Sequence, residues 1–249
     1  MATPRRKTAT AAFIASPILF LVAVGVAGAS VRALALAAVN ADVFDLAGSV
    51  ETQAQPDADY LAHFIASKGL DQPSSDCGDS FTRASLTVNL AALDAATKAL
   101  DVPASDAAER NAIRAAEHRL ACNPLDGNAW LRYAMVENKG AGPVKSVIDA
   151  LRTSYWTAPS EGWIIESRLP FATNLVLAGA DGFEAEYVDD LRRFTAYEST
   201  SRVASAYVAL SRSVRQRLRP VIDAQPETRR KAILAEIDRL GVDYGRDGP

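Results

Sequence analysis

The sequence predicts an all-α protein, with one N-terminal transmembrane helix followed by an array of helical hairpins. Alanine, leucine, arginine and glutamate are abundant, and runs that alternate β-branched with polar residues are scarce. Apolar residues instead recur three and four positions apart along most of the chain. A basic start followed by a long uncharged apolar run indicates an export segment.

The N-terminal segment predicts how the chain is placed in a membrane. Residues 1–10 hold three basic residues, whereas the run from Ala11 to Ala29 holds no charge. As a helix this run spans about 28 Å, close to the ~30 Å hydrocarbon core of a bilayer. Because the basic side stays inside, we expect residues 1–10 in the cytoplasm and residues 11–30 as an inner-membrane anchor. The main domain would then lie in the periplasm.

A cleaved secretory signal is the alternative for the same segment. The tripeptide from Ala27 to Ala29 fits a small-residue cleavage site, although the apolar run is longer than the ~7–15 residues typical of a leader. The run also continues into Val31–Val39, which favours a retained helix. Either way, about 220 residues reach the same compartment, which is enough for a sizeable core.

Residues 31–122 predict the first helical hairpins. A short helix starts near Asn40, and another covers 57–67, where Gly69 ends it. A longer helix carries a leucine stripe that ends near Leu100, and residues 101–105 break it. Ser105 or Asp106 is then placed to cap the next helix, which carries Ala112, Ile113, Ala116 and Leu120.

The two cysteines, Cys77 and Cys122, flank this last pair of helices. Consecutive helices with a short connection pack antiparallel, so both cysteines fall at the same end of the hairpin. An oxidising periplasm lets a disulfide persist there, and we therefore expect one. Two buried free thiols are the alternative.

Residues 123–180 predict three further helices. The first starts at Asn123 and stops before Gly140, and the second covers 144–156 after Pro143. The third runs from about Pro159 to Leu177, where the internal Pro170 should kink or split it. Residues 181–249 then supply the C-terminal helices. One ends near residue 194, two more occupy 199–240 on either side of Gln225-Pro226, and a frayed tail follows.

A repeat is visible in residues 123–180. Pro124-Leu-Asp-Gly127 and Pro159-Ser-Glu-Gly162 share a pattern 35 residues apart, and each opens a helix with a tryptophan near its start. With Trp130-x-x-Tyr133-Ala134, this unit resembles the tetratricopeptide (TPR) family, which implies a TPR-like helical-hairpin array. The chain departs from the family at Glu137, where tyrosine is usual, and at Val147, where alanine is expected.

A second resemblance rests on the anchor, the repeat, the run Cys122-Asn-Pro-Leu-Asp-Gly-Asn-Ala-Trp130 and the segment from Ser154 to Trp163. With these features the chain resembles a class of bacterial envelope proteins. That resemblance implies an accessory or scaffolding part in a polysaccharide system, such as exopolysaccharide or O-antigen synthesis. It implies protein partners in the cell envelope rather than a catalytic role.

Candidate contact residues come from two groups. The first is aromatic, and such side chains either anchor a ligand in a groove or simply fill the spaces between repeat helices. The second is basic and falls on one side of a C-terminal helix, where it either binds an acidic partner or forms an ordinary solvated face. The residues are Trp130, Tyr133, Tyr155, Trp156 and Trp163 in the first group and Arg212, Arg215 and Arg219 in the second.

Several function classes find little support. The 27 basic and 30 acidic residues are mixed along the chain, so no basic stripe predicts nucleic-acid binding. His63 and His118 are the only histidines; we expect His118 on the surface and no metal, because the cysteines lack histidine partners nearby. The sequence carries neither a Gly-x-Ser-x-Gly motif nor a glycine-rich phosphate loop. We therefore expect no cofactor and no enzymatic activity.

The expected function is a non-catalytic, membrane-anchored periplasmic scaffold that binds protein partners. The runner-up is a secreted periplasmic protein that holds a small ligand or a glycan between its helices. A helical glycan-modifying enzyme is a third alternative, and it would need carboxylates that converge in one cleft.

Overall fold

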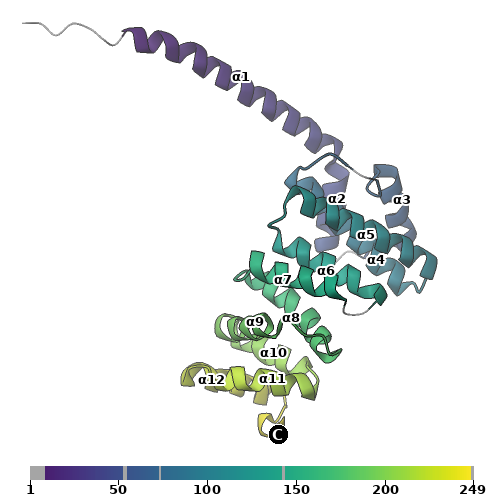
Figure 1. Cartoon of the computed structure of the whole chain (residues 1–249), viewed down its shortest axis with the longest axis vertical. Helices are drawn as coiled ribbons and strands as arrows, with labels where there is room; N and C mark the ends of the chain where they lie inside the picture. The colour runs from purple at the N-terminus through teal and green to yellow at the C-terminus, as the bar shows by residue number, and fades with distance from the viewer. Residues whose placement is uncertain (1–8, 53–54, 73, 142–143, 248–249) are drawn as a thin grey trace, which may run out of the picture.

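The computed structural model describes residues 9–52, 55–72, 74–141 and 144–247, and every regular element in these ranges is helical. The all-α class is therefore confirmed for this part of the chain (Figure 1). The elements are α1 (Ala9–Val39), α2 (Ala41–Glu51), α3 (Ala58–Lys68), α4 (Asp79–Lys98), α5 (Val102–Cys122), α6 (Gly127–Ala141), α7 (Lys145–Thr157), α8 (Gly162–Leu177), α9 (Glu184–Tyr197), α10 (Thr200–Ala209), α11 (Arg212–Asp223), α12 (Glu227–Arg239) and the 3₁₀ turn η1 (Tyr244–Asp247).

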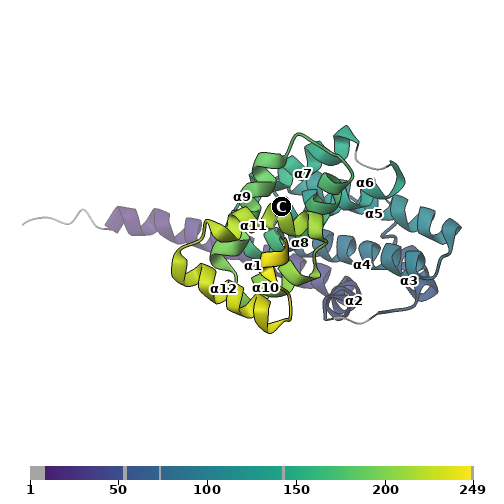
Figure 2. The same cartoon turned by 90° about the horizontal axis from the view of Figure 1, so that it is seen from below.

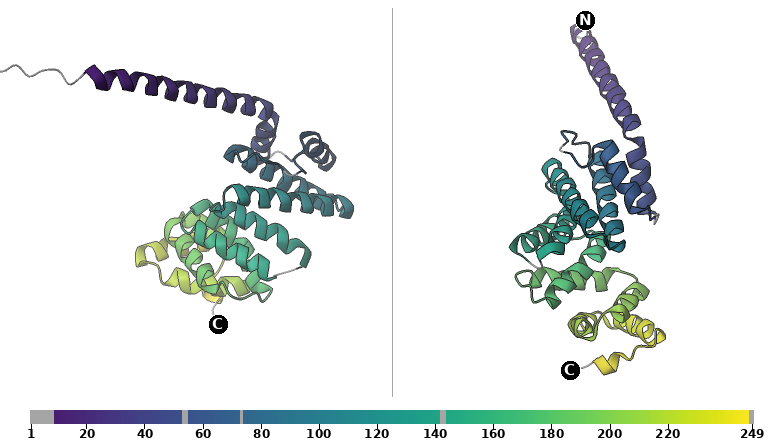
Figure 3. Two further views of the ribbon diagram at one scale, coloured as in Figure 1. Left: turned by 45° about the horizontal axis from the view of Figure 1, so that its top comes forward. Right: turned by 90° about the vertical axis from the view of Figure 1, so that its right-hand side faces the viewer.

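Helix α1 projects from the rest of the molecule, as two further views also show (Figures 1 and 3). It runs without a break to Val39, and Asn40 alone separates it from α2. Its apolar side chains from Leu19 to Val26 are more than half exposed. None of the helices in the described part of the chain combines the length and the apolar character that a membrane crossing requires. Residues 1–8 of the predicted cytoplasmic segment lie outside the described residues.

Consecutive helices pair along the body of the molecule. Helix α4 packs against α5, α6 against α7 and α8 against α9, while α2 and α3 both cover α4. Seen from below, the helices from α2 to α12 follow an arc (Figure 2). This arrangement is a stack of helical hairpins, as the repeat pattern predicts.

Local signals explain where the early helices begin and end. The Asp57 side chain accepts from the N–H of Asp59 and caps α3, and Gly69 ends it with φ of 64°. The prediction that Ser105 or Asp106 caps α5 is wrong. Asp101 is the cap, and its carboxylate accepts from the N–H of Ala104 at 3.0 Å. Pro103 does not delay the helix, because a proline in the first turn interrupts no hydrogen bond.

The start of α6 also differs from the prediction, since the helix begins at Gly127 instead of Asn123. The Asp126 carboxylate caps it by accepting from the N–H of Ala129 at 3.0 Å. Pro170 lies inside α8, which continues to Leu177 as one helix and is not split. The predicted position of Pro143 lies outside the described residues.

The C-terminal third contains one more break than predicted. Residues 199–223 form α10 and α11 rather than one helix, because Leu210 and Ser211 adopt extended backbone with ψ of 151° and 158°. The tail is also more ordered than predicted. Tyr244 in η1 donates to the carbonyl of Arg219 at 3.2 Å and stacks against Tyr207 at 5.3 Å. Residues 248–249 lie outside the described part.

The largest hydrophobic cluster runs through the C-terminal two-thirds of the body. It extends from Leu131 in α6 to Ile237 in α12. Three smaller clusters hold α2 to α6 together. Leu90 contributes to two of the smaller clusters, and Trp130 lies between one of them and the large one. The body is therefore a continuous stack in which each hairpin packs on the next.

Candidate binding groove

The helices of this stack form a groove with a volume of about 690 Å³. Helices α4, α6 and α8, the first helix of each hairpin, line it together with the end of α2 and the α5–α6 loop. Its volume falls in the range of ~300–1,000 Å³ that is usual for ligand sites. Its lining includes Glu51, Asp79, Arg83, Arg119, Leu125, Asp126, Asn128, Arg132, Glu161 and Trp163.

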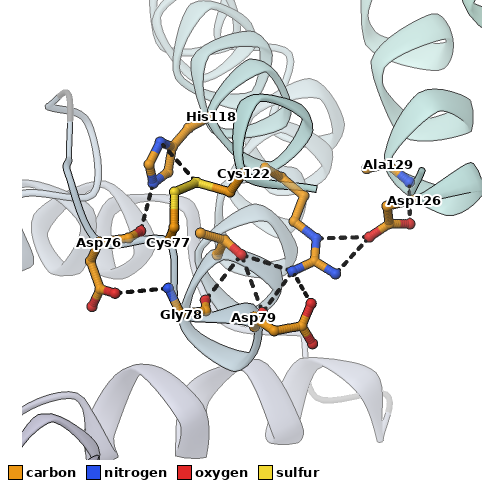
Figure 4. Close-up of polar contacts among 10 residues, drawn as sticks. Asp76, Cys77, Gly78, Asp79, His118, Cys122, Asp126 and Ala129 are labelled. Atoms are coloured by element: carbon orange, nitrogen blue, oxygen red, sulfur yellow. Dashed lines mark hydrogen bonds and ion pairs between the residues drawn. A yellow bond between two sulfur atoms is a disulfide. The ribbon is translucent and has the colours of Figure 1, made fainter. Parts of the chain in front are cut away.

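Arg119 connects the elements around this groove, and its partners Asp79 and Asp126 are labelled in Figure 4. Its side chain is 6% exposed, and Nε donates to the Asp126 carboxylate at 2.7 Å. Nη1 donates to the carbonyl of Asp79 and to the hydroxyl of Thr82, each at 2.8 Å. Burial alone would lower the pKa of Arg119, but the bonds to Asp126 and Asp79 outweigh it and raise the pKa. One guanidinium thus joins α4, α5 and the cap of α6.

The disulfide lies beside this cluster. Cys77 and Cys122 are joined as predicted, with their Cα atoms 5.3 Å apart. His118 is half-buried rather than on the surface; its Nε2 lies 2.9 Å from the carbonyl oxygen of Asp76, and its Nδ1 lies 4.0 Å from Cys122 Sγ. The expectation that the cysteines lack a histidine nearby is therefore wrong. The spacing of four between His118 and Cys122 on one helix already places the two side chains close together. The contact with Asp76 could not be judged from sequence, because residues 76 and 118 are far apart in the chain.

The polar groups of the groove are paired unevenly. Arg83 contacts Glu51 at 3.4 Å on the exposed rim. Arg132 in α6 has no carboxylate partner among the described residues, and its Nη1 contacts only the thioether of Met135 at 3.7 Å. Burial lowers the pKa of Arg132. Asn128, one turn earlier, has a buried Oδ1 without a hydrogen-bond partner in the described structure.

Two large apolar side chains stand open at the groove. Trp163, in the first turn of α8, is 54% exposed, and Leu125 in the α5–α6 loop is 71% exposed. They belong to the two repeats of the sequence pattern, since each lies close to its Pro-x-x-Gly segment. Exposed aromatic and aliphatic side chains at a concave surface are typical of contact anchors.

The other predicted aromatic residues do not join Trp163. Trp130 and Tyr133 pack edge to face at 6.4 Å, and the Trp130 indole donates to the carbonyl of Pro124 at 2.8 Å. Burial, the largest influence, raises the pKa of Tyr133. Tyr155 is buried under the guanidinium of Arg168, 4.1 Å from the ring centre, whereas Trp156 is 81% exposed and does not line the groove.

The predicted basic residues lie at the other end of the molecule. Arg215 stands 5.7 Å from the Tyr207 ring and Arg219 stands 4.8 Å from the Tyr244 ring. Arg219 also contacts the Asp223 carboxylate at 3.7 Å, and Arg212 is exposed at the start of α11. Arg215 and Arg219 thus contact aromatic residues of the C-terminal end and are absent from the groove lining.

A second buried arginine fixes the helices behind the groove. Arg168 in α8 is fully buried and binds Asp190 of α9 through two bonds of 2.7 and 2.8 Å. It also donates to the carbonyls of Ser154 and Ala158 at the end of α7, at 2.9 and 3.3 Å. Burial raises the pKa of the Asp190 carboxyl, and the neighbouring guanidinium opposes that rise. This network orients α7, α8 and α9.

The described groove lining carries the carboxylates of Glu51, Asp79, Asp126 and Glu161. Asp79 and Asp126 are both engaged by Arg119, and the described lining contains neither histidine nor cysteine. No group of three or more histidine, cysteine or acidic residues suited to a metal ion occurs in the described part of the chain.

Sequence reasoning missed the groove residues Arg132 and Asn128. A signal was present in their spacing of four, which places them on a different face of the helix from the buried Leu131 and Ala134. Searches against family models, curated proteins and solved structures found no match to this chain.

Proposed function

We propose that the protein is a non-catalytic scaffold of the bacterial envelope, anchored in the inner membrane by its N-terminal helix. Its periplasmic body would bind a protein partner in the groove between α4, α6 and α8. The observation that carries this proposal is the groove itself, whose lining combines the exposed Trp163 and Leu125 with the unpaired Oδ1 of Asn128.

The anchor rests on the N-terminal sequence and on the form of α1. The basic start and the uncharged run from Ala11 to Ala29 favour insertion with the N-terminus in the cytoplasm. The exposed apolar side chains of α1 from Leu19 to Val26 have no cover from the body, and a lipid phase would supply it. The disulfide is the kind of bond that an oxidising periplasm preserves.

A protein partner suits the groove because binding hot spots combine large apolar side chains with polar groups that are shielded from water. Repeat stacks also present extended concave surfaces, which accommodate extended or helical segments. The connection to polysaccharide synthesis or export rests on the resemblance to envelope accessory proteins, and it identifies the first partners to test.

Site-specific photocrosslinking in intact bacterial cells tests the partner. A photoreactive amino acid replaces Trp163 or Leu125 in the groove, and Tyr60, which is 52% exposed on α3, serves as the matched control. We expect discrete adducts with envelope proteins from both groove positions and none of the same adducts from Tyr60. Equal labelling from all three positions, or a glycan or lipid in place of a protein, would contradict the proposal.

Reporter fusions test the membrane orientation separately. A reporter that is active only in the cytoplasm and another that is active only in the periplasm are each joined after Asp247. We expect activity from the periplasmic reporter alone, together with a full-length N-terminus in the mature protein. Cytoplasmic activity would refute export, and a new N-terminus at Ser30 would refute the anchor in favour of a secreted protein.

A further inference from the structure

Arg132 is the one arginine of the described groove lining that has no carboxylate partner in the described structure. Arg83 pairs with Glu51, and Arg119 pairs with both Asp79 and Asp126. The Arg132 guanidinium instead contacts the Met135 sulfur at 3.7 Å, which is a weak acceptor. Burial lowers its pKa, and no nearby charge offsets that effect. The groove therefore holds a partly shielded guanidinium that has no carboxylate partner in the described structure.

A charge that is partly removed from water loses solvation unless a counter-ion and hydrogen bonds replace it. A methionine of similar length would fill the same space without this penalty. The arginine is therefore unfavourable for folding and favourable for holding an anion that enters the groove. A residue with this balance is typical of a binding site.

Asn128 adds a second unsatisfied group on the same helix. It precedes Arg132 by four residues, so the two side chains lie one turn apart along α6, and both line the groove. Its Oδ1 is buried and accepts no hydrogen bond in the described structure. The Arg132 guanidinium, which lacks a carboxylate partner, thus lies on the same helix as an amide oxygen that accepts no hydrogen bond in the described structure, one turn away.

From this pairing we infer that Arg132 and Asn128 receive an acidic residue of the partner polypeptide. The aspartate or glutamate carboxylate accepts from the Arg132 guanidinium, and a backbone N–H of the same segment donates to Asn128 Oδ1. The apolar neighbours of that acidic residue contact Trp163 and Leu125. This inference rests on the proposed function and specifies the partner sequence: an acidic residue flanked by large apolar ones.

The groove favours a polypeptide over an acidic glycan. The exposed side chain of Leu125 offers an aliphatic surface, which suits an apolar side chain better than a sugar hydroxyl. The unpaired Asn128 Oδ1 needs a donor close to the anion, and each residue of a peptide supplies an N–H at that position.

Selection from a displayed library of random peptides tests this inference on the full-length protein in lipid nanodiscs. Chosen peptides are labelled, and their affinities for the wild type, Arg132→Met and Arg110→Met are measured by fluorescence anisotropy. Arg110 is exposed on α5 and does not line the groove, so it provides the matched control. Each peptide is also made with its acidic residue replaced by the amide.

We expect selected peptides to share an acidic residue next to apolar ones. Arg132→Met should weaken binding roughly ten- to a hundredfold, the effect of losing a charge-assisted hydrogen bond, and Arg110→Met should not. The acid-to-amide change should weaken binding to the wild type but not to Arg132→Met. The melting temperature of Arg132→Met should equal or exceed that of the wild type.

Two results would overturn this inference and leave the groove function intact. In the first, the selected peptides lack an acidic residue. In the second, they bind Arg132→Met as tightly as the wild type yet fail to bind Trp163→Ala. No peptide binding that depends on Trp163 would overturn the proposed function itself. Binding of polygalacturonate, in place of any peptide, would assign the groove to an anionic glycan and refute both. A lower melting temperature for Arg132→Met would show that the arginine serves the fold.

Discussion

At the scale of single residues, Gly127 shows how closely the helices of one repeat approach. A Cβ atom on Gly127 would lie 2.4 Å from the Cβ of Ala158 and 3.1 Å from its backbone nitrogen. Neither atom can move without shifting the end of α7. We expect Gly127→Ala to lower the free energy of unfolding by about 1–3 kcal/mol, as overpacking does in a tight core. Urea denaturation followed by circular dichroism measures this loss.

Gly162 is the matched control, because it holds the equivalent place in the second Pro-x-x-Gly segment. A Cβ there meets only the Glu198 carboxylate, at 3.7 Å. Gly162→Ala should therefore leave stability unchanged or raise it slightly, since alanine is the better helix former. Equal losses at the two positions would show that helix initiation, and not contact with Ala158, decides the effect.

Residue-scale predictions succeeded where a local signal decides the outcome. Asp57 and Gly69 bound α3 as expected, because a cap and a left-handed glycine act within one turn. The two clamping arginines escaped notice. Arg119 and Arg168 look like surface residues in sequence. Their burial depends on Asp79 and Asp190, which lie on other helices, and on Asp126 in the loop before α6.

At the scale of helices, the Arg168–Asp190 pair decides how α8 meets α7 and α9. Both residues are buried, so removing one partner strands a charge without water. We expect Asp190→Leu to lower the free energy of unfolding by about 3–5 kcal/mol. Arg168→Met should have a similar effect, because the Asp190 carboxylate then lacks its counter-ion. Chemical denaturation at neutral pH measures both losses.

The double variant Arg168→Met/Asp190→Leu separates the charge from the packing. Since both charges are absent, we expect a smaller loss than the sum of the two single losses. The neighbouring surface pair of Arg193 and Asp189, at 2.8 Å, provides the control, and Arg193→Met should change stability by at most ~1 kcal/mol. Strict additivity would show that the hydrogen bonds of Arg168 to α7, rather than the ion pair, dominate.

Most helices were predictable because their apolar stripes follow the helical period. The break between α10 and α11 was not, since neither glycine nor proline stands at Leu210 or Ser211. The apolar residues that follow the helical period here, Val203, Tyr207, Val214 and Leu218, are all buried. They lie on two helices, however, and not on one. Packing of α10 on α12 and of α11 on α9 redirects the chain there. Such contacts cannot be read from a local window.

At the scale of the molecule, the disulfide braces one end of a stack whose units contact mainly their neighbours. It closes a loop with a sequence separation of 45 around α4 and α5, where the hydrophobic clusters are smaller than in the C-terminal part. We expect Cys77→Ser/Cys122→Ser to destabilise these hairpins by about 2–4 kcal/mol. Amide hydrogen exchange should accelerate in α4 and α5 while α8 and α9 retain their protection.

A uniform acceleration across α4 to α12 would contradict this expectation and show that the stack unfolds as one unit. Full reduction of the wild type should reproduce the exchange pattern of the double serine variant. A serine variant that differs from the reduced protein would point to the loss of the His118 contact at Cys122 rather than to the crosslink.

The sequence predicted the architectural class of the molecule, a stack of helical hairpins, but not the curvature of that stack. The cysteine pairing and the period of 35 residues both predicted stacked hairpins, which the structure bears out. The groove depends on how far each hairpin turns relative to the previous one. That rotation depends on contacts between hairpins, such as the pair of Arg119 and Asp126, which joins α5 to the cap of α6. No pattern within a single helix carries this information.

The join at Asn40 limits where the protein can work. Helix α1 passes into α2 through this single residue, so the stack has no slack tether to its first helix. If α1 lies in the lipid, the body stays close to the membrane surface. A binding partner must then reach that surface to be bound. A flexible spacer inserted at Asn40 would then let the body bind partners farther from the membrane. It would also loosen the fixed orientation of the body relative to the bilayer.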